Sequence, residues 1–447
     1  MKAAGAITAA WILLVALGWA TGSAWVIGVG SLVLIPLPVA IFRSRRCPFD
    51  PLEPGWLLFG LFAFTYCLVP VGVLIEPDAF NSLPGYLDYS APYWALAAVL
   101  GGVAYIALCA GYWSPVGDFA KRILPRGGPL DATRACGLTA VVLFVAGLAS
   151  VGAAVVLFGG GANVLGQRQA IVGNLSGHGY LSVGFIALAL SLPCAAAWAS
   201  ERRTRGAFSL VAAAGVIALF ALLAIVGSRL LALALVLGTV VVIHYKVRRL
   251  ATWMVAAIIA VCAVVGVWIL VTRAGISVSR PIYAVGYISN TLDGFPWLAD
   301  AMSRVRHFAY GKSIVQDISL TFFPRALWPG KPDVFGVVAL QETVAPGLTQ
   351  SVGGAGTFPV GLVGEGYLNF GVIGAVLIPF LSGALVRAIS LRLLERLDLF
   401  YVVVAAWLLP SELALIRGFG SFIPLLVLIG LMASLILIRE RRPVPGL

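Results

Sequence analysis

The chain has 447 residues, of which 61% are hydrophobic and only 11% are charged, and its formal net charge is +12. Soluble domains carry about 25% charged residues, so this composition excludes an ordinary soluble protein and predicts a multi-pass membrane protein. A mean hydropathy of +1.01 agrees with that class. The positive charge does not indicate nucleic-acid binding, because the basic residues alternate with apolar segments, as orientation signals of membrane proteins do.

Cysteine and histidine are scarce. The six cysteines lie in apolar segments or beside a basic loop: Cys47, Cys67, Cys109, Cys136, Cys194 and Cys262. We therefore expect no extracytoplasmic disulfide. Because there are three histidines and no Cys/His spacing typical of zinc, the sequence predicts neither a metal site nor a cofactor.

Twelve segments are long and apolar enough to cross a membrane, which takes about 20 residues. They are centred near residues 13, 33, 65, 102, 146, 190, 217, 237, 261, 376, 404 and 430. The first could also be a signal peptide, since Lys2 precedes an apolar run and residues 20–24 resemble a cleavage site. We expect a retained helix.

Basic clusters follow every second apolar segment. They comprise Arg43, Arg45 and Arg46; Lys121, Arg122, Arg126 and Arg134; Arg202, Arg203 and Arg205; Lys246, Arg248 and Arg249; Arg387, Arg392 and Arg396; and Arg439, Arg441 and Arg442. Basic loops stay on the cytoplasmic side, so both termini are expected there.

One long polar interruption, residues 273–360, separates the ninth and tenth segments. The expected fold is all-α: a single transmembrane domain over residues 1–447, with this stretch as a large extracytoplasmic loop that carries short helices. Residues 303–317 are predicted to form one interfacial helix, with Val305, Phe308 and Ala309 against lipid.

Basic residues on the expected outer face of the membrane are the most specific chemical indication of function. Short outer loops should avoid arginine, yet three of them carry Arg168, Arg229 and Arg417. The long loop adds Arg280, Arg304, Arg306, His307, Arg325 and Lys331. Arginine suits a lipid-linked pyrophosphate because its planar fork donates two parallel hydrogen bonds and keeps its charge. The alternative is that each arginine binds lipid headgroups or caps a helix.

A hydroxyl acceptor would also need a group that takes its proton. The candidates are Glu365, His307, Asp317 and Glu412. Glu365 lies where the loop returns to the membrane, between two glycines that let other backbone approach closely. A structural ion pair with one of the arginines is the alternative for this carboxylate.

The quoted motifs resemble a known family. Pro324-Arg325, Leu327-Trp328-Pro329 and Lys331-Pro332, followed by Gly364-Glu365-Gly366-Tyr367-Leu368-Asn369-Phe370-Gly371, are similar to O-antigen and oligosaccharide repeat-unit polymerases of the Wzy type. Gly227-Ser228-Arg229 and Arg417-Gly418 also resemble that family, and the likeness covers most of the chain. The family's arginine-rich loop between the middle spans is represented here mainly by Arg168.

The resemblance implies a metal-independent, GT-C-like glycosyltransferase in the bacterial inner membrane, with a periplasmic active face. It would transfer a growing glycan from undecaprenyl pyrophosphate to an incoming undecaprenyl-pyrophosphate-linked repeat unit. Expected partners are these oligosaccharides and membrane lipids, with a chain-length regulator as an optional third. In the implied scheme Arg168, Arg229, Arg325 and Arg417 hold the donor pyrophosphate, Arg280, Arg304 or Arg306 positions the acceptor, Glu365 or His307 takes the proton, and Tyr310, Trp328 and Tyr367 stack on sugars.

Three other functions stay open. An O-antigen ligase would share the outer-face arginines and a catalytic base. A transporter of lipid-linked sugars would favour charges deep in several spans and paired broken helices. A nonenzymatic scaffold would leave the placement of the arginines unexplained.

Overall fold

The computed structural model describes residues 2–44, 50–80, 91–124, 132–157, 179–226, 229–274, 282–283, 285, 295–305, 307–320, 328–332, 336–344, 360–396, 399–416 and 418. All regular secondary structure within these ranges is helical. The elements are α1 (Lys2–Thr21), α2 (Ala24–Leu32), α3 (Leu37–Ser44), α4 (Trp56–Ala63), the π-helix η1 (Phe64–Leu68), α5 (Val69–Ile75), α6 (Pro77–Phe80), α7 (Ala91–Trp113), α8 (Pro115–Ile123), α9 (Ala132–Leu157), α12 (Gly179–Arg202), α13 (Arg205–Phe220), η2 (Ala221–Ile225), α14 (Arg229–Val242), η3 (Ile243–Val247), α15 (Thr252–Ala274), α17 (Phe295–Arg304), α18 (Lys312–Leu320), α19 (Gly336–Val344), α21 (Leu362–Arg396) and α22 (Leu399–Ile416).

Eight helices of the described residues are long and apolar enough to cross a membrane. They contain the predicted centres near 13, 33, 65, 102, 146, 190, 217 and 376, so an all-α, multi-pass membrane protein is confirmed. The centres near 237 and 261 fall in shorter apolar helices, and the centre near 404 falls in α22. The centre near 430 lies outside the described residues, so the count of twelve stays a prediction.

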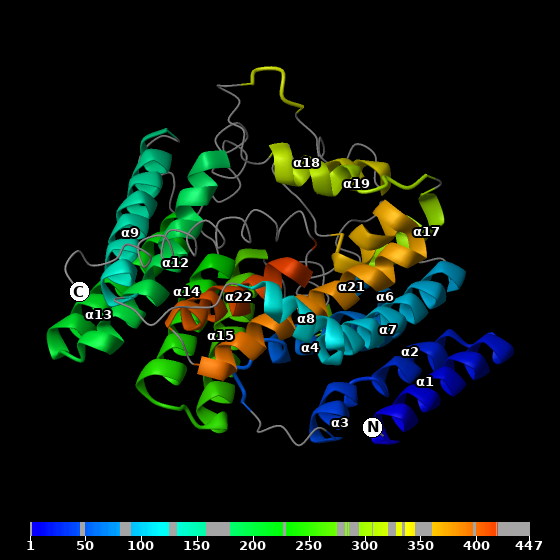
Figure 1. Cartoon of the computed structure of the whole chain (residues 1–447). Coiled ribbons are helices and arrows are strands. Elements are labelled where there is room, and N and C mark those ends of the chain that lie inside the picture. The colour runs from blue at the N-terminus through cyan, green and yellow to red at the C-terminus, as the bar shows by residue number, and fades with distance from the viewer. Residues whose placement is uncertain are drawn as a thin grey trace.

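The helices pack around two large apolar cores. One core gathers α9, α12, α14 and α22, and the other gathers α1, α4, α7, α17 and α21 (Figure 1). Glycines bring α7 and α21 into backbone contact, because a β-carbon at Gly111 would overlap the carbonyl of Phe380. At Gly383 a β-carbon would likewise overlap the carbonyl of Leu108. Small residues allow such close helix packing in membranes.

Ion pairs bring the described basic clusters to one end of the bundle, which we call the basic end. Lys246 pairs with Glu201, which precedes Arg202, at 3.7 Å, and Lys121 pairs with Glu395. The segment between α3 and α4 completes the set: its Asp50 pairs with Arg249 at 2.6 Å and its Glu53 pairs with Arg387 at 3.2 Å. These contacts gather the paired residues at one end of the bundle, while the side of the membrane that this end faces stays a prediction.

Short helices of the predicted long loop lie at the opposite end, which we call the loop end, where α18 and α19 lie above α21 and α7 (Figure 1). All residues from Phe295 to Met302 of α17 are buried, and α17 packs against α7 and α21. The single interfacial helix predicted over residues 303–317 is wrong, because α17 ends at Arg304 and α18 begins at Lys312. Val305 and Ala309, which were expected to face lipid, pack on an apolar cluster instead.

Candidate active site

A broken helix organises the loop end. α21 leaves helical geometry at Phe370 (φ −136°, ψ 16°) and at Gly371 (φ 66°, ψ −151°). Residues eight apart in a continuous helix are separated by about 12 Å along the axis. Here a β-carbon at Gly366 would come within 2.6 Å of the carbonyl oxygen of Gly374, so the first two turns of α21 fold back on the remainder. The predicted close backbone approach beside Glu365 is thus present at Gly366.

Glu365 lies in the folded-back segment, and its side chain is fully buried. A β-carbon at Gly418 would come within 2.6 Å of Glu365 Oε2, so the carboxylate rests against the backbone of the last described residue. Gly418 has φ +123°, a conformation that only glycine adopts readily. The Gly364–Gly371 motif and Gly418, which the sequence marked independently, therefore meet at this carboxylate.

Asn369 joins the broken helix to the loop between α17 and α18. Its Nδ2 donates to the Glu365 carbonyl oxygen at 2.9 Å and to Ser313 Oγ at 2.8 Å. Its Oδ1 accepts the Gly311 N–H at 3.1 Å and lies 2.9 Å from the Ser313 hydroxyl. Asn369 is completely buried, and every polar atom of its side chain has a partner. This pattern fixes the segment that carries Glu365 relative to the loop.

Backbone bonds and aromatic rings reinforce the same junction. The N–H groups of Ala309 and Tyr310 donate to the carbonyl oxygens of Leu368 and Asn369, at 2.9 and 2.8 Å. These bonds satisfy carbonyls that the end of a helix leaves without intrahelical partners. The ring of Phe308 packs edge-on against Tyr367, with 5.8 Å between ring centroids.

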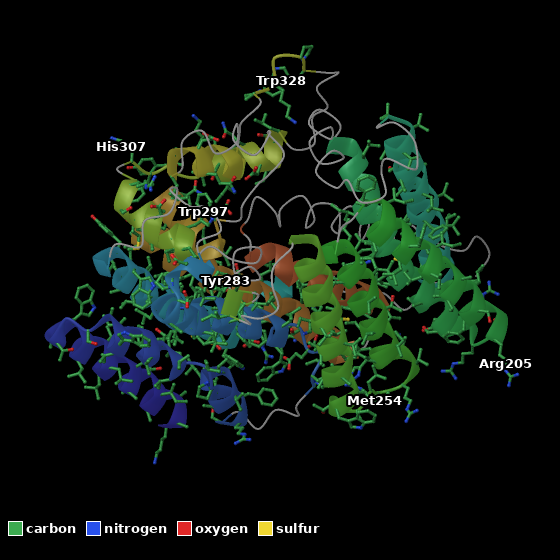
Figure 2. The ribbon with its side chains drawn as sticks, turned by 180° about the vertical axis from the view of Figure 1, so that it is seen from behind. Arg205, Met254, Tyr283, Trp297, His307 and Trp328 are labelled. Atoms are coloured by element: carbon green, nitrogen blue, oxygen red, sulfur yellow. The ribbon has the colours of Figure 1, made fainter. Side chains whose placement is uncertain are left out.

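Besides Glu365, the structure describes further sequence-predicted site residues at the loop end. Tyr367 is half-buried at the junction, while His307 is exposed and lies at the periphery of Figure 2. Arg304 pairs with buried Asp300 at 2.8 Å and donates to the Val344 carbonyl at 3.3 Å, so its guanidinium holds α17 to α19. Lys331 lies in a turn, and its backbone N–H donates to the Trp328 carbonyl oxygen at 3.0 Å. Figure 2 shows Trp328 at the outermost tip of the loop end.

The other predicted cations are not tested by the described geometry. Arg168, Arg280, Arg306, Arg325 and Arg417 lie outside the described residues. Arg229 is the first residue of α14, but only its backbone is described. The convergence of these arginines on one site stays a prediction.

The structure describes the side chain of one of the two remaining candidate bases, Asp317, but not that of the other, Glu412. Asp317 is buried in α18, and a β-carbon at Gly336 would overlap its carboxylate, so it packs beneath the start of α19. Glu412 lies in α22, where its side chain is not described. Of the four candidates, Glu365 alone is described in contact with a second motif.

Sequence reasoning missed Asn369 and Ser313 as members of the site. A usable signal was present, because Glu365 and Asn369 are four residues apart and share one face of a helix in an apolar segment. Ser313 carries no comparable signal, since its role depends on the turn that positions α18. No group of three potential metal ligands occurs among the described residues.

A second buried polar network lies at the basic end. Glu53 Oε1 accepts from the Tyr112 hydroxyl at 2.6 Å and from Arg387 at 3.2 Å. Burial raises the pKa of Glu53, although the Tyr112 hydrogen bond and the Arg387 charge oppose this. Its many internal partners identify this network as a structural connection between helices.

Asp50 belongs to the same segment and contacts His244. The Leu250 N–H donates to His244 Nδ1 at 3.1 Å, which leaves Nε2 to carry the hydrogen that faces Asp50 Oδ1 at 3.2 Å. Burial acts to raise the pKa of Asp50, but the hydrogen bonds from His244 and the Leu52 N–H outweigh it and lower that pKa.

Comparison of the chain with protein-family models, curated proteins and solved structures gives no match.

Proposed function

We propose that this protein is a membrane glycosyltransferase that polymerises lipid-linked oligosaccharide repeat units. One observation carries the proposal: a fully buried carboxylate, Glu365, lies in a broken helix at the loop end and touches the glycine that follows Arg417. A carboxylate beside a guanidinium-bearing loop suits a reaction that removes a proton from a hydroxyl and stabilises a departing pyrophosphate.

In the proposed reaction, the acceptor sugar hydroxyl attacks the anomeric carbon of the donor glycan. The bond from that carbon to the undecaprenyl pyrophosphate oxygen breaks, and a glycosidic bond forms. Glu365 takes the hydroxyl proton, and undecaprenyl pyrophosphate leaves with the bonding electron pair. Arg417, Arg325, Arg229 and Arg168 are proposed to neutralise the leaving pyrophosphate, because arginine donates bidentate hydrogen bonds to phosphate oxygens.

Sidedness follows from the same proposal. The basic end lies on the cytoplasmic side of a bacterial inner membrane, because loops rich in lysine and arginine stay on that side. The loop end then faces the periplasm, where lipid-linked repeat units await polymerisation. Glu365 would lie near the outer membrane boundary, within reach of a pyrophosphate headgroup.

Two alternatives retain support from specific features. A buried Glu365 with neighbouring arginines would also serve an O-antigen ligase, whose acceptor is a lipid-core sugar. The break at Phe370–Gly371 also fits a transporter of lipid-linked oligosaccharides, since discontinuous helices line many transporter sites. Loss of the protein would leave a different surface glycan for each of these functions.

Deletion of the gene in its native bacterium separates the three functions. Loss of a polymerase leaves single repeat units attached to the lipid A core. Loss of a ligase leaves the core bare while polymer accumulates on the undecaprenyl carrier, and loss of a transporter leaves neither product at the outer face. We expect the deletion strain to carry single repeat units on its lipid A core. Reintroducing the wild-type chain should restore polymer, whereas reintroducing the Glu365→Gln variant should not. A bare core in the deletion strain would reject the polymerase proposal.

A further inference from the structure

The short helix α8 carries an exposed apolar face that the glycan chemistry does not use. Val116, Phe119 and Ile123 are 40%, 61% and 72% exposed, and their spacing places them on one side of the helix. Asp118 and Arg122 are exposed on a second side. The third side packs against α21, where a β-carbon at Gly117 would come within 2.8 Å of Arg387 Cγ.

Polar contacts lock α8 onto α21 in this orientation. The Ser114 hydroxyl accepts the Val116 N–H at 3.2 Å and so caps the start of α8. Arg392 of α21 donates to the carbonyl oxygens of Lys121 and Leu124, at 2.8 and 3.4 Å from Nη2. Lys121 also pairs with Glu395. The outward direction of the apolar face is therefore set by the fold.

The part of α21 that α8 covers indicates what the exposed face of α8 contacts. Leu377 and Leu381 of α21 are half-exposed, as expected for side chains that face lipid. Ala384 and Glu395 continue the same stripe at helical spacing, and both lie against α8. Since α8 sits on the lipid-facing stripe of α21, its own outer face points toward lipid.

The depth of α8 follows from the length of α21. Val372 and Ile373 are exposed, so the part of α21 that follows the break at Gly371 faces lipid from its first turn. A hydrocarbon layer of about 30 Å takes about 20 residues at 1.5 Å each, which places its far boundary near Arg392. The contacts of α8 with residues 384–395 straddle that boundary.

We propose that α8 is an interfacial helix, with Val116, Phe119 and Ile123 embedded in the leaflet at the basic end and Arg122 at the lipid phosphates. Helices with one apolar and one charged face lie in the headgroup region in this way. The inference is independent of the glycan chemistry. A second copy of the chain or a soluble protein would be the competing occupants of the face.

A pair of neighbouring labels tests the proposal. Phe119→Cys and Asp118→Cys each receive a bimane fluorophore, and the full chain is reconstituted in phosphatidylglycerol–phosphatidylcholine nanodiscs with or without doxyl-labelled lipid. The described cysteines are buried except Cys262, which is half-buried, so the signal is taken as the difference from the unsubstituted chain. Ile123→Cys replaces Phe119→Cys if the latter does not fold.

The label at position 119 should be quenched by doxyl lipid at least twofold more than the label at 118, which should instead be quenched by aqueous iodide. Equal iodide quenching at both positions would overturn the proposal, because the apolar face would then lie in water. Protection of position 119 from both quenchers would also overturn it, because a protein surface would then cover the face.

Discussion

The carboxylate of Glu365 rests against Gly418, where an added β-carbon would lie 2.6 Å from Oε2. The two residues are far apart in the sequence, and each belongs to a motif singled out for a different reason. Their contact brings the Glu365 motif against the glycine that follows Arg417, while the position of the Arg417 guanidinium stays a prediction. It also makes Gly418 a sensitive position for testing that site.

Gly418→Ala should displace the Glu365 carboxylate and strain the backbone at φ +123°. We expect a loss of about 1–3 kcal/mol of stability, together with loss of polymer formation. Thermal unfolding in detergent and a gel of surface polysaccharide report the two effects. Gly60→Ala is the control, because no neighbouring atom lies within 4 Å of a β-carbon there. Equal behaviour of both variants would contradict the described contact.

The two glycines that flank Glu365 should respond differently to alanine. At Gly366 a β-carbon would come within 2.6 Å of the Gly374 carbonyl oxygen, whereas at Gly364 it would only reach ordinary contact with Val360, at 3.8 Å. Gly366→Ala should therefore destabilise the protein by about 1–3 kcal/mol, as overpacking does. Gly364→Ala should leave the midpoint of thermal unfolding nearly unchanged. A larger effect at Gly364 would reject the folded-back geometry.

Replacement of Asn369 by leucine should disconnect the broken helix from the loop that precedes α18. The Gly311 N–H and the Ser313 hydroxyl would lose a buried partner, and each unsatisfied group costs about 1–3 kcal/mol. Ser313→Ala should cost less, because Asn369 keeps its bonds to Gly311 and to the Glu365 carbonyl. Thermal unfolding of both variants tests this order, and a milder effect of Asn369→Leu would contradict it.

Asp50→Asn should lower stability at neutral pH and leave it unchanged in strong acid. The folded protein lowers the pKa of Asp50 below its ordinary value of 3.8, so the ionised carboxylate stabilises the fold. That stabilisation is fully present above 3.8 and is lost as the pH falls through the lower folded-state pKa. The measurement is the difference in unfolding midpoint between wild type and variant across this range. A difference that stays constant down to the lowest pH would rule out the assigned pKa direction.

Apolar segment length predicted most of the helices, because a membrane requires long runs of hydrophobic residues whatever their neighbours are. Basic clusters such as those of Lys121 and Arg249 predicted a shared side of the membrane. The structure pairs Lys121 with Glu395 and Arg249 with Asp50 at one end of the bundle, and the side that this end faces stays a prediction. The break at Gly371 and the partnership of Asn369 with Ser313 were not predictable, because they depend on how the chain turns between α17 and α18. The ion pair between buried Glu53 and half-buried Arg387 was missed for a related reason, since a charge pattern indicates sidedness and not which residues touch.

The most direct test of the polymerase proposal is a reaction with the purified chain in liposomes and defined undecaprenyl-pyrophosphate-linked repeat units. Wild-type protein should produce carrier-linked glycans of two or more units and release undecaprenyl pyrophosphate, while a folded Glu365→Gln variant should leave single units. Equal chain growth by Glu365→Gln, or no chain growth by the wild-type protein on its native repeat unit, would contradict the account.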